Sequence, residues 1–327
     1  MSRRGQRANL RDIAEAAGVS MQTASRVVRG VDVVAEPTRL RVLAAIDELN
    51  YQPNMAARSL SARRTGSVHI IDAVPLLHGH ATTFVAICQE LAALGLQIST
   101  SVIRGEMENL ALRELVPVGA DGVIVLGGRH EPSSWVTSLA TQLPTVFVGQ
   151  THDLPDLAAG VAVDHRLGAR AAVEHLLQRG CTNIAHVAGP MDWGDARLRH
   201  DGYLAACAEP GIRPRVLHAG AWDATAAAPL MLNLDPAIDG IFAANDHLAL
   251  GCMTALQLAG RSVPGDVKVV GFDDAMGSES FLPPLTTIRQ DFRAVGEAAV
   301  AALNLLLTGE RAESVTITPT LVVRSST

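Results

Sequence analysis

Residues 9–30 read NLRDIAEAAGVSMQTASRVVRG, which is the pattern of two short amphipathic helices separated by a turn. The apolar residues of the first half recur at the i, i+3, i+4, i+7 spacing of one helical face: Leu10, Ile13, Ala14 and Ala17. Gly18 follows them, and a left-handed turn costs least in a residue without Cβ. We therefore predict a helix-turn-helix, although an ordinary helical hairpin fits the same pattern.

The second helix of this pair has an inward and an outward face. Ser20 is placed to cap it, and Ala24, Val27 and Val28 share the face that turns inward. The side chains that can face outward are Met21, Gln22, Ser25, Arg26 and Arg29. The N-terminal turn of such a helix fits the major groove of DNA.

The charge of the chain is unevenly distributed. Residues 1–65 contain eleven arginines and six acidic residues, which gives a net charge of +5. Because the whole chain has a net charge of −6, the remaining residues have a net charge of −11. A basic N-terminal block on an acidic body is expected when only one end of a protein meets phosphates. This asymmetry favours the DNA-binding helix-turn-helix over the ordinary hairpin.

Two further features follow the helix pair. Residues 36–49 have a broad apolar face formed by Leu40, Val42, Leu43, Ile46 and Leu49, and Pro37 suits a first helical turn, so we predict a third helix. After Pro53, a short helix is predicted over residues 55–62, with Asn54 as its cap. So short a helix is marginal alone in water, so it should fold only when something holds it.

From residue 67 the pattern becomes one of short apolar runs alternating with Ala- and Leu-rich helices. The strands are predicted over residues 67–74, 96–103, 121–128, 144–150, 160–164, 183–189, 213–220, 239–246, 267–274 and 320–324. Helices are predicted over Phe84–Leu94, Leu167–Arg179, His247–Ala259 and Arg293–Leu307. This alternation indicates an α/β body of parallel sheets, which bind ligands at the carboxyl ends of their strands.

Composition excludes several classes of protein. The 327 residues are 48% hydrophobic and 3% aromatic, enough for a small head and a body of one or two lobes. No apolar run could span a bilayer and the N-terminus lacks the apolar core of a signal peptide, so we expect a cytoplasmic protein without a membrane partner. The four cysteines are scattered, which indicates buried thiols and no metal site or cofactor.

Several stretches together make the chain similar to the lactose repressor family of bacterial transcription regulators. They are LRDIAEAAGVSMQTASRVV (10–28), ELNYQPN (48–54), VAGPMDWGDARLR (187–199), AANDHLALGCM (243–253) and VVGFDDAMGSESFLPPLTTIRQDF (269–292). The resemblance implies a DNA-binding head at 1–52, a hinge helix and linker at 53–65, and a two-lobed body with a periplasmic-binding-protein-like fold at 66–327. Its N-lobe would comprise about 66–164 and 292–319, and its C-lobe about 165–291 and 320–327.

The resemblance also implies DNA contacts in the head and the hinge. Met21, Gln22 and Arg26 match the family's base-reading positions, and Gln and Arg can pair with adenine and guanine. Phosphate contacts are expected of Ser20, Thr23, Ser25 and Asn54, for which capping or solvation are the alternatives. Leu60 matches a leucine that inserts into the minor groove, and Ala57 matches a residue that lets two paired hinge helices approach each other. The alternative for Leu60 is that it packs on the body.

The same resemblance implies an effector site in the body. The matching residues are Arg197, Asn245, Trp222 and Asp273, with Phe292, Gln290 and Leu77 bordering the cleft. A guanidinium, an amide and a carboxylate suit sugar hydroxyls, and aromatic rings suit the C–H face of a pyranose. For Asp246 and Asp274 we expect contacts with backbone amides or with the other lobe.

We therefore expect a homodimeric repressor, associated with the nucleoid, that leaves a pseudo-palindromic operator when a small sugar binds. A regulator of the same family that uses a purine or another metabolite as co-repressor is the alternative. A sugar-transport protein would need an export signal and no basic head. We expect no enzyme and no catalytic residues, because the adjacent Asp273 and Asp274 cannot flank a glycosidic bond and no hydrolase motif is present.

Overall fold

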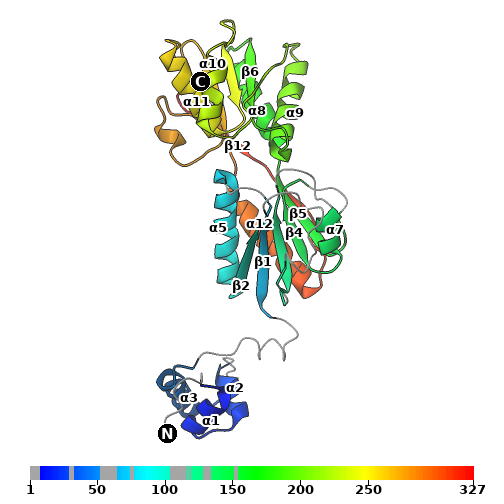
Figure 1. The fold of residues 1–327 in the computed structure, drawn as a ribbon, viewed down its shortest axis with the longest axis vertical. Helices are drawn as coiled ribbons and strands as arrows, with labels where there is room; N and C mark the ends of the chain where they lie inside the picture. Colours follow the sequence, from blue (N-terminus) through cyan, green and yellow to red (C-terminus); the bar gives the residue numbers. More distant parts are fainter. Residues whose placement is uncertain are drawn as a thin grey trace. The chain divides into compact units, whose positions relative to one another are not determined.

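The computed structural model describes residues 8–28, 33–51, 65–73, 77–103, 116–117, 119–127, 134–150 and 154–327. They belong to two units, Met1–Gly66 and Ser67–Thr327 (Figure 1). The predicted hinge helix at 55–62 lies outside the described residues, as do Asn54, Ala57 and Leu60.

Three helices form the N-terminal unit: α1 (Leu10–Ala17), α2 (Met21–Val28) and α3 (Glu36–Glu48). Asn9 caps α1 through a capping box with Asp12. Gly18 ends α1 with φ +63°, and the Ser20 hydroxyl accepts a hydrogen bond from the Thr23 amide at 3.1 Å. The predicted glycine turn and the serine cap are both confirmed.

The core of this unit is small and rich in alanine. Its buried residues are Ile13, Ala14, Ala17, Ala24, Val27, Val42 and Ala45. The predicted face of α3 is wrong in part, because Leu40 is 58% exposed and Leu43 42% exposed. Val42, Ala45 and Ile46 point to one side of α3, and Leu40 lies about 200° around the helix from Val42.

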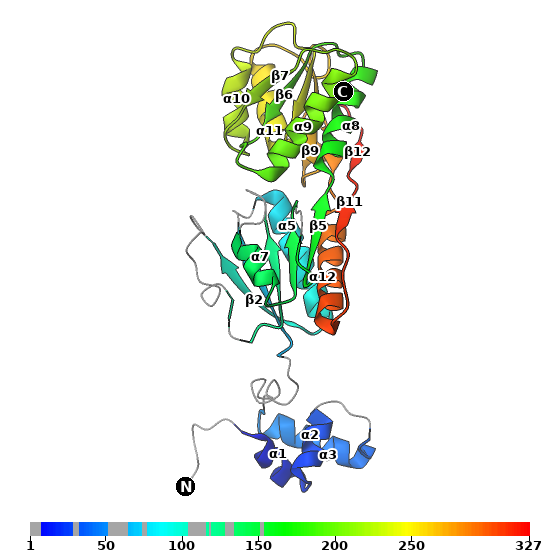
Figure 2. The same cartoon turned by 90° about the vertical axis from the view of Figure 1, so that its right-hand side faces the viewer.

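The second unit contains two sheets, each covered by helices on both faces (Figures 1 and 2). The N-lobe sheet is parallel and has the order β2-β1-β3-β4-β5-β11. Its strands are β1 (Ser67–Asp72), β2 (Gln97–Val102), β3 (Gly122–Leu126), β4 (Thr145–Val148), β5 (Ala158–Val163) and β11 (Val315–Ile317). Its helices are α5 (His78–Ala93), α7 (Ser134–Ala140) and α12 (Phe292–Thr308).

The C-lobe repeats this plan with the order β7-β6-β8-β9-β10-β12, in which only the β10–β12 pair is antiparallel. Its strands are β6 (Ile184–Ala188), β7 (Arg215–His218), β8 (Gly240–Ala243), β9 (Lys268–Asp273), β10 (Thr286–Arg289) and β12 (Thr320–Val322). Its helices are α8 (His165–Gln178), α9 (Gly194–Ala208), α10 (Ala224–Met231), α11 (Asp246–Leu258) and the short 3₁₀ turn η1 (Ser278–Ser280). The predicted α/β fold with a helix-turn-helix head and a two-lobed body is confirmed.

The chain passes between the two lobes three times. It crosses from β5 to α8 near Asp164, from β10 to α12 near Gln290, and from β11 to β12 near Pro319. As a result α12 and β11, late in the sequence, lie beside the strands of the N-lobe (Figures 1 and 2). In each lobe the first five strands have the doubly wound order 2-1-3-4-5, which places a ligand crevice at the carboxyl edge.

Candidate functional site

The outer face of α2 presents the three predicted base-reading residues to solvent. Met21 is 57% exposed, and Gln22 and Arg26 are also exposed, as is the cap residue Ser20. Thr23 and Ser25 are half-buried. These positions stay predictions, but their exposure leaves them accessible to the floor of a DNA groove.

Replacing Gln22 or Arg26 with alanine is expected to weaken binding to the specific operator by about 1–3 kcal/mol each. Both side chains are exposed, so the head should keep its stability. The measurement is a gel-shift titration against operator and random duplexes. Arg11→Ala is the matched control, because Arg11 lies on α1 and pairs with Glu15 at 3.1 Å; an equal loss in this variant would show that only charge matters.

A cavity of about 540 Å³ lies where the carboxyl ends of the two sheets face each other. The N-lobe lines it with the ends of β3, β4 and β5 and with the first turns of α5 and α12. The C-lobe lines it with the start of α9 and the residues that follow β7, β8 and β9. Its size lies in the range of about 300–1,000 Å³ that small-molecule sites occupy.

The structure brings six of the seven predicted effector residues to this cavity. They are Leu77, Trp222, Asn245, Asp273, Gln290 and Phe292. The seventh, Arg197, does not line it, and its guanidinium donates to the carbonyl oxygen of Met191 at 3.1 Å. Arg199 lines the cavity instead.

The helical phase of α9 explains this difference. Its buried face is formed by Ala196, Arg199, Tyr203 and Ala206, which follow one another at helical spacing. Arg197 lies about 200° away from Arg199 around the helix. The sequence did not predict α9, because an arginine on its inward face interrupts the apolar pattern. Ala196 and Tyr203 lie on the same face of the helix as Arg199, and their spacing would have indicated Arg199 as the inward-facing arginine.

Arg199 is 4% exposed and its charge is fully engaged. One Nη donates to the Ala244 carbonyl oxygen at 2.5 Å, and the other lies 3.5 Å from the Asp273 carboxylate and 3.9 Å from that of Asp195. Nε lies 3.3 Å from His165 Nδ1. This single guanidinium therefore joins α8, α9, β8 and β9 at the wall of the cavity.

The two carboxylates beside Arg199 respond differently to their surroundings. Burial opposes ionisation of Asp195, but His165 at 3.2 Å and Arg199 together hold the pKa of its carboxyl well below the usual range. Burial raises the pKa of Asp273, against the attraction of Arg199 and a hydrogen bond from Gln290 at 2.6 Å. Asp195 is thus a fixed negative charge beside the arginine.

Asn245 and Trp222 form the next part of the wall. Asn245 caps α11, because its Oδ1 accepts from the Leu248 amide at 2.8 Å, and its Nδ2 donates to the Trp222 carbonyl oxygen at 3.0 Å. The Trp222 ring packs closely over Gly189, where a Cβ would come within 2.6 Å of it. Its indole Nε1 is buried and has no hydrogen-bond acceptor among the described residues.

Several lining residues were missed by the sequence analysis. Trp193 precedes α9, is 4% exposed and lies edge-on to Trp222, with 5.8 Å between ring centroids. His80 from the N-lobe lies edge-on to Trp193 at 5.5 Å, and His78 is edge-on to Phe292 at 5.7 Å. The two histidine contacts join side chains that are more than 100 positions apart, so no local spacing could reveal them.

Asp246 lies behind the cavity wall and is fully buried. It accepts hydrogen bonds from the Ala275 amide at 2.6 Å and from the Thr287 hydroxyl at 2.5 Å, as predicted for a residue that satisfies backbone amides. Burial and the nearby negative charge of Asp273 raise the pKa of Asp246 to about 8, although both hydrogen bonds oppose this shift.

The raised pKa of Asp246 predicts a pH-dependent stability. The folded state holds this proton until about pH 8, whereas an unfolded Asp releases it near pH 4, so raising the pH across that window destabilises the fold. The contribution of this bound proton to the free energy of unfolding is fully present below about pH 4 and is lost above about pH 8. Its slope reaches about 1.4 kcal/mol per pH unit.

Asp246→Asn removes the titrating group and keeps a similar shape. We therefore expect the free energy of unfolding of the wild type, relative to the Asn variant, to fall by up to about 3 kcal/mol between pH 5.5 and 7.5. Urea unfolding of both proteins at the two pH values measures this difference. A difference that stays constant with pH would contradict the prediction.

Comparison with known proteins assigns both units. Residues 9–54 match the family model described as bacterial regulatory proteins, lacI family. Residues 173–327 match that of a periplasmic binding protein-like domain. A lactose operon repressor from Escherichia coli (strain K12) is 33% identical over 97% of this chain and 90% of its own length. The chain belongs to the lacI family.

Two further relatives bear on this lacI-family regulator. The crystal structure of a lac repressor dimer bound to operator and the anti-inducer ONPF superposes with a TM-score of 0.87 at 31% identity, covering 98% of this chain and 99% of that one. The transcriptional repressor PurR of Actinobacillus pleuropneumoniae serotype 3 (strain JL03) is 30% identical over 98% of both chains. The regulator is thus a DNA-binding protein of transcription and not an enzyme.

No helix in the described part of the regulator is long and apolar enough to span a bilayer. All four cysteines are free, and Cys181, Cys207 and Cys252 are buried while Cys88 is half-buried. Burial raises the pKa of each of these thiols, so they remain protonated and pack as small apolar side chains.

Proposed function

We propose that this lacI-family regulator is a repressor that leaves its operator when an uncharged sugar occupies the cavity between the lobes. The observation that carries the proposal is the engagement of Arg199 by Asp195 and Asp273. Four acidic residues and this one arginine line the cavity among the described residues. A phosphorylated or otherwise anionic ligand would therefore meet an excess of negative charge.

The remaining wall suits hydroxyl groups and sugar rings. Asp273 can accept from hydroxyls, and Asn245 can both donate and accept. The buried Nε1 of Trp222 supplies a donor that needs an acceptor, and the rings of Trp222, Trp193 and Phe292 offer apolar surface to the C–H face of a sugar. Arg197 has no part in the proposal, and Arg199 takes the role expected of it.

A purine or another metabolite is the second candidate effector. The similarity to PurR favours it, and the same aromatic rings could stack on a purine base. In that case the ligand would act as a co-repressor and strengthen DNA binding.

The DNA-bound form is proposed to be a homodimer on a pseudo-palindromic operator in the nucleoid. The lac repressor dimer bound to operator, to which the chain is similar over nearly its whole length, supports this arrangement. Two heads related by a two-fold axis match two half-sites of a palindrome. The hinge positions Asn54, Ala57 and Leu60 belong to this proposal.

A thermal-shift screen of the full chain tests the effector. The panel holds lactose, cellobiose and ribose, the bases guanine and hypoxanthine, and glucose with glucose 6-phosphate. We expect a neutral sugar to raise the melting temperature and to release the protein from DNA that flanks its gene in a gel shift. Stabilisation by a purine base alone, or by glucose 6-phosphate in preference to glucose, would overturn the proposal.

A further inference from the structure

Two consecutive acidic residues, the last residue of β9 and the one that follows it, have positive φ angles. Asp273 has φ +114°, which a residue with a Cβ adopts only when its surroundings impose it, and Asp274 has φ +56°, in the left-handed region that aspartate tolerates. Asp273 lines the effector cavity, whereas Asp274 is not part of its wall. Some contact outside the cavity must therefore hold this strand end in place.

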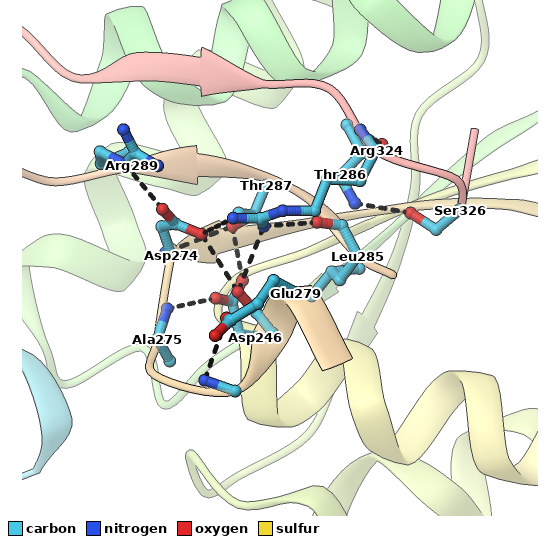
Figure 3. Close-up of polar contacts among 12 residues, drawn as sticks. Asp246, Asp274, Ala275, Glu279, Leu285, Thr286, Thr287, Arg289, Arg324 and Ser326 are labelled. Atoms are coloured by element: carbon cyan, nitrogen blue, oxygen red, sulfur yellow. Dashed lines mark hydrogen bonds and ion pairs between the residues drawn. The ribbon is translucent and has the colours of Figure 1, made fainter. Parts of the chain in front are cut away.

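Asp274 makes that contact through both of its carboxylate oxygens (Figure 3). Oδ2 accepts from Arg289 Nε at 2.7 Å, and Oδ1 accepts from Arg324 Nη2 at 2.7 Å. The Ser278 hydroxyl adds a third bond at 3.1 Å. Although burial opposes ionisation, Arg324 and Arg289 lower the pKa of Asp274, so the carboxylate stays charged.

One of the two arginines lies directly at a chain crossing between the lobes, and the other lies one strand beyond a second crossing. Arg289 is the last residue of β10, directly before the crossing to α12. Arg324 follows β12, the strand that begins after the crossing from β11, and so lies at the far end of that strand from the crossing. Arg324 is also bound to the carbonyl oxygen of Leu285 at 2.8 Å, so its position is fixed on the C-lobe side.

The first of these crossings is held from the cavity side as well. Gln290 follows Arg289, and its amide donates to Asp273 at 2.6 Å. Asp273 thus binds Gln290, and the next residue, Asp274, binds Arg289. A ligand that competes for Asp273 must alter its bond to Gln290, while Asp274 keeps Arg289 and Arg324 in place.

We propose that Asp274 is a positioning residue that fixes Asp273 in the effector site and ties it to the β10–α12 and β11–β12 crossings. Occupancy of the cavity is then transmitted to the relative orientation of the lobes. The transmission of occupancy to the lobes rests on the proposed effector function, whereas the positioning role of Asp274 does not.

The ligand-independent part is tested by hydrogen exchange of the full chain without any effector. Asp274→Asn and Arg324→Gln should speed exchange of the amides of 289–292 and 320–322 by at least about fivefold. Arg289→Gln is a milder variant, since this side chain is 53% exposed, and should affect 289–292 alone. Asp156→Asn is the matched control, because it breaks an exposed pair with Arg311 away from these crossings.

Unchanged exchange at the two crossings, or an increase spread evenly over the C-lobe, would overturn the positioning role. The coupling is tested by operator release with lactose and cellobiose as probes. If they release the wild type, Asp274→Asn should need at least about fivefold more sugar, and an unchanged response would overturn the coupling. If neither probe nor any other sugar releases the wild type, the proposed effector function fails, whereas the exchange result still decides the role of Asp274.

Discussion

Replacing Arg199 with alanine is expected to lower the free energy of unfolding of the body by about 3–5 kcal/mol. The guanidinium is 4% exposed and lies between the carboxylates of Asp195 and Asp273, so its loss leaves Asp195 with His165 alone and the buried Asp273 with only the hydrogen bond from Gln290. The variant should also lose its response to any effector, because the repulsion between these acids displaces the cavity wall. Urea unfolding and the gel-shift release assay measure both effects.

Arg197→Ala is the matched control for this prediction. The two arginines lie on the same helix, but Arg197 is half-buried and its bond is to a backbone carbonyl. We expect a change below about 1 kcal/mol in this variant and a normal effector response. If Arg199→Ala does not fold, Arg199→Lys keeps the charge and loses the fork geometry. A strong loss of the effector response in Arg197→Ala together with a normal response in Arg199→Lys would contradict the assignment of Arg199 to the effector site.

Replacing Ile13 with alanine is expected to abolish DNA binding. Ile13 is completely buried in a core otherwise built of small residues, and removing so large a side chain costs about 2–5 kcal/mol. A three-helix unit of this size has little stability to lose, so its head should unfold at 37 °C. The body is a separate unit and should keep its melting temperature and its effector response.

Leu40→Ala serves as the control on the same unit. Leu40 is 58% exposed on α3, so its truncation should leave DNA binding nearly unchanged. The measurement is operator affinity together with circular dichroism of both variants. Full operator affinity in Ile13→Ala would show that the small core is not what holds the recognition helix.

Much of the fold follows from patterns that span only a few residues. The i, i+3, i+4, i+7 spacing of Ile13, Ala14 and Ala17, the turn at Gly18 and the cap at Ser20 are local, and the structure contains each of them. The alternation of apolar strands and helices predicted the α/β body in the same way. The missed elements were short or polar, such as β10, β11 and α9.

The effector cavity was predictable where polar residues follow apolar strands. Asn245 after β8 and Asp273 after β9 reach the cavity because the carboxyl ends of parallel strands meet at one edge of a sheet. The error at Arg197 arose within a helix, where a shift of two residues moves a side chain to the opposite face. No motif indicates that shift, whereas the buried phase of Ala196 and Tyr203 does.

Periodicity along the chain was therefore sufficient for the helix pair of the head, the α/β body and the strand ends that carry the ligand residues, whereas the division of the body into two lobes was expected from the family resemblance. The order of strands in the folded sheets was needed to bring Arg199 against Asp273, and Asp274 against Arg289 and Arg324. The physical reason is that an apolar face leaves a regular trace in neighbouring residues, because each of its members avoids water independently. A buried ion pair leaves no such trace, since each charge is tolerated only through a partner that the fold brings from a distant part of the chain.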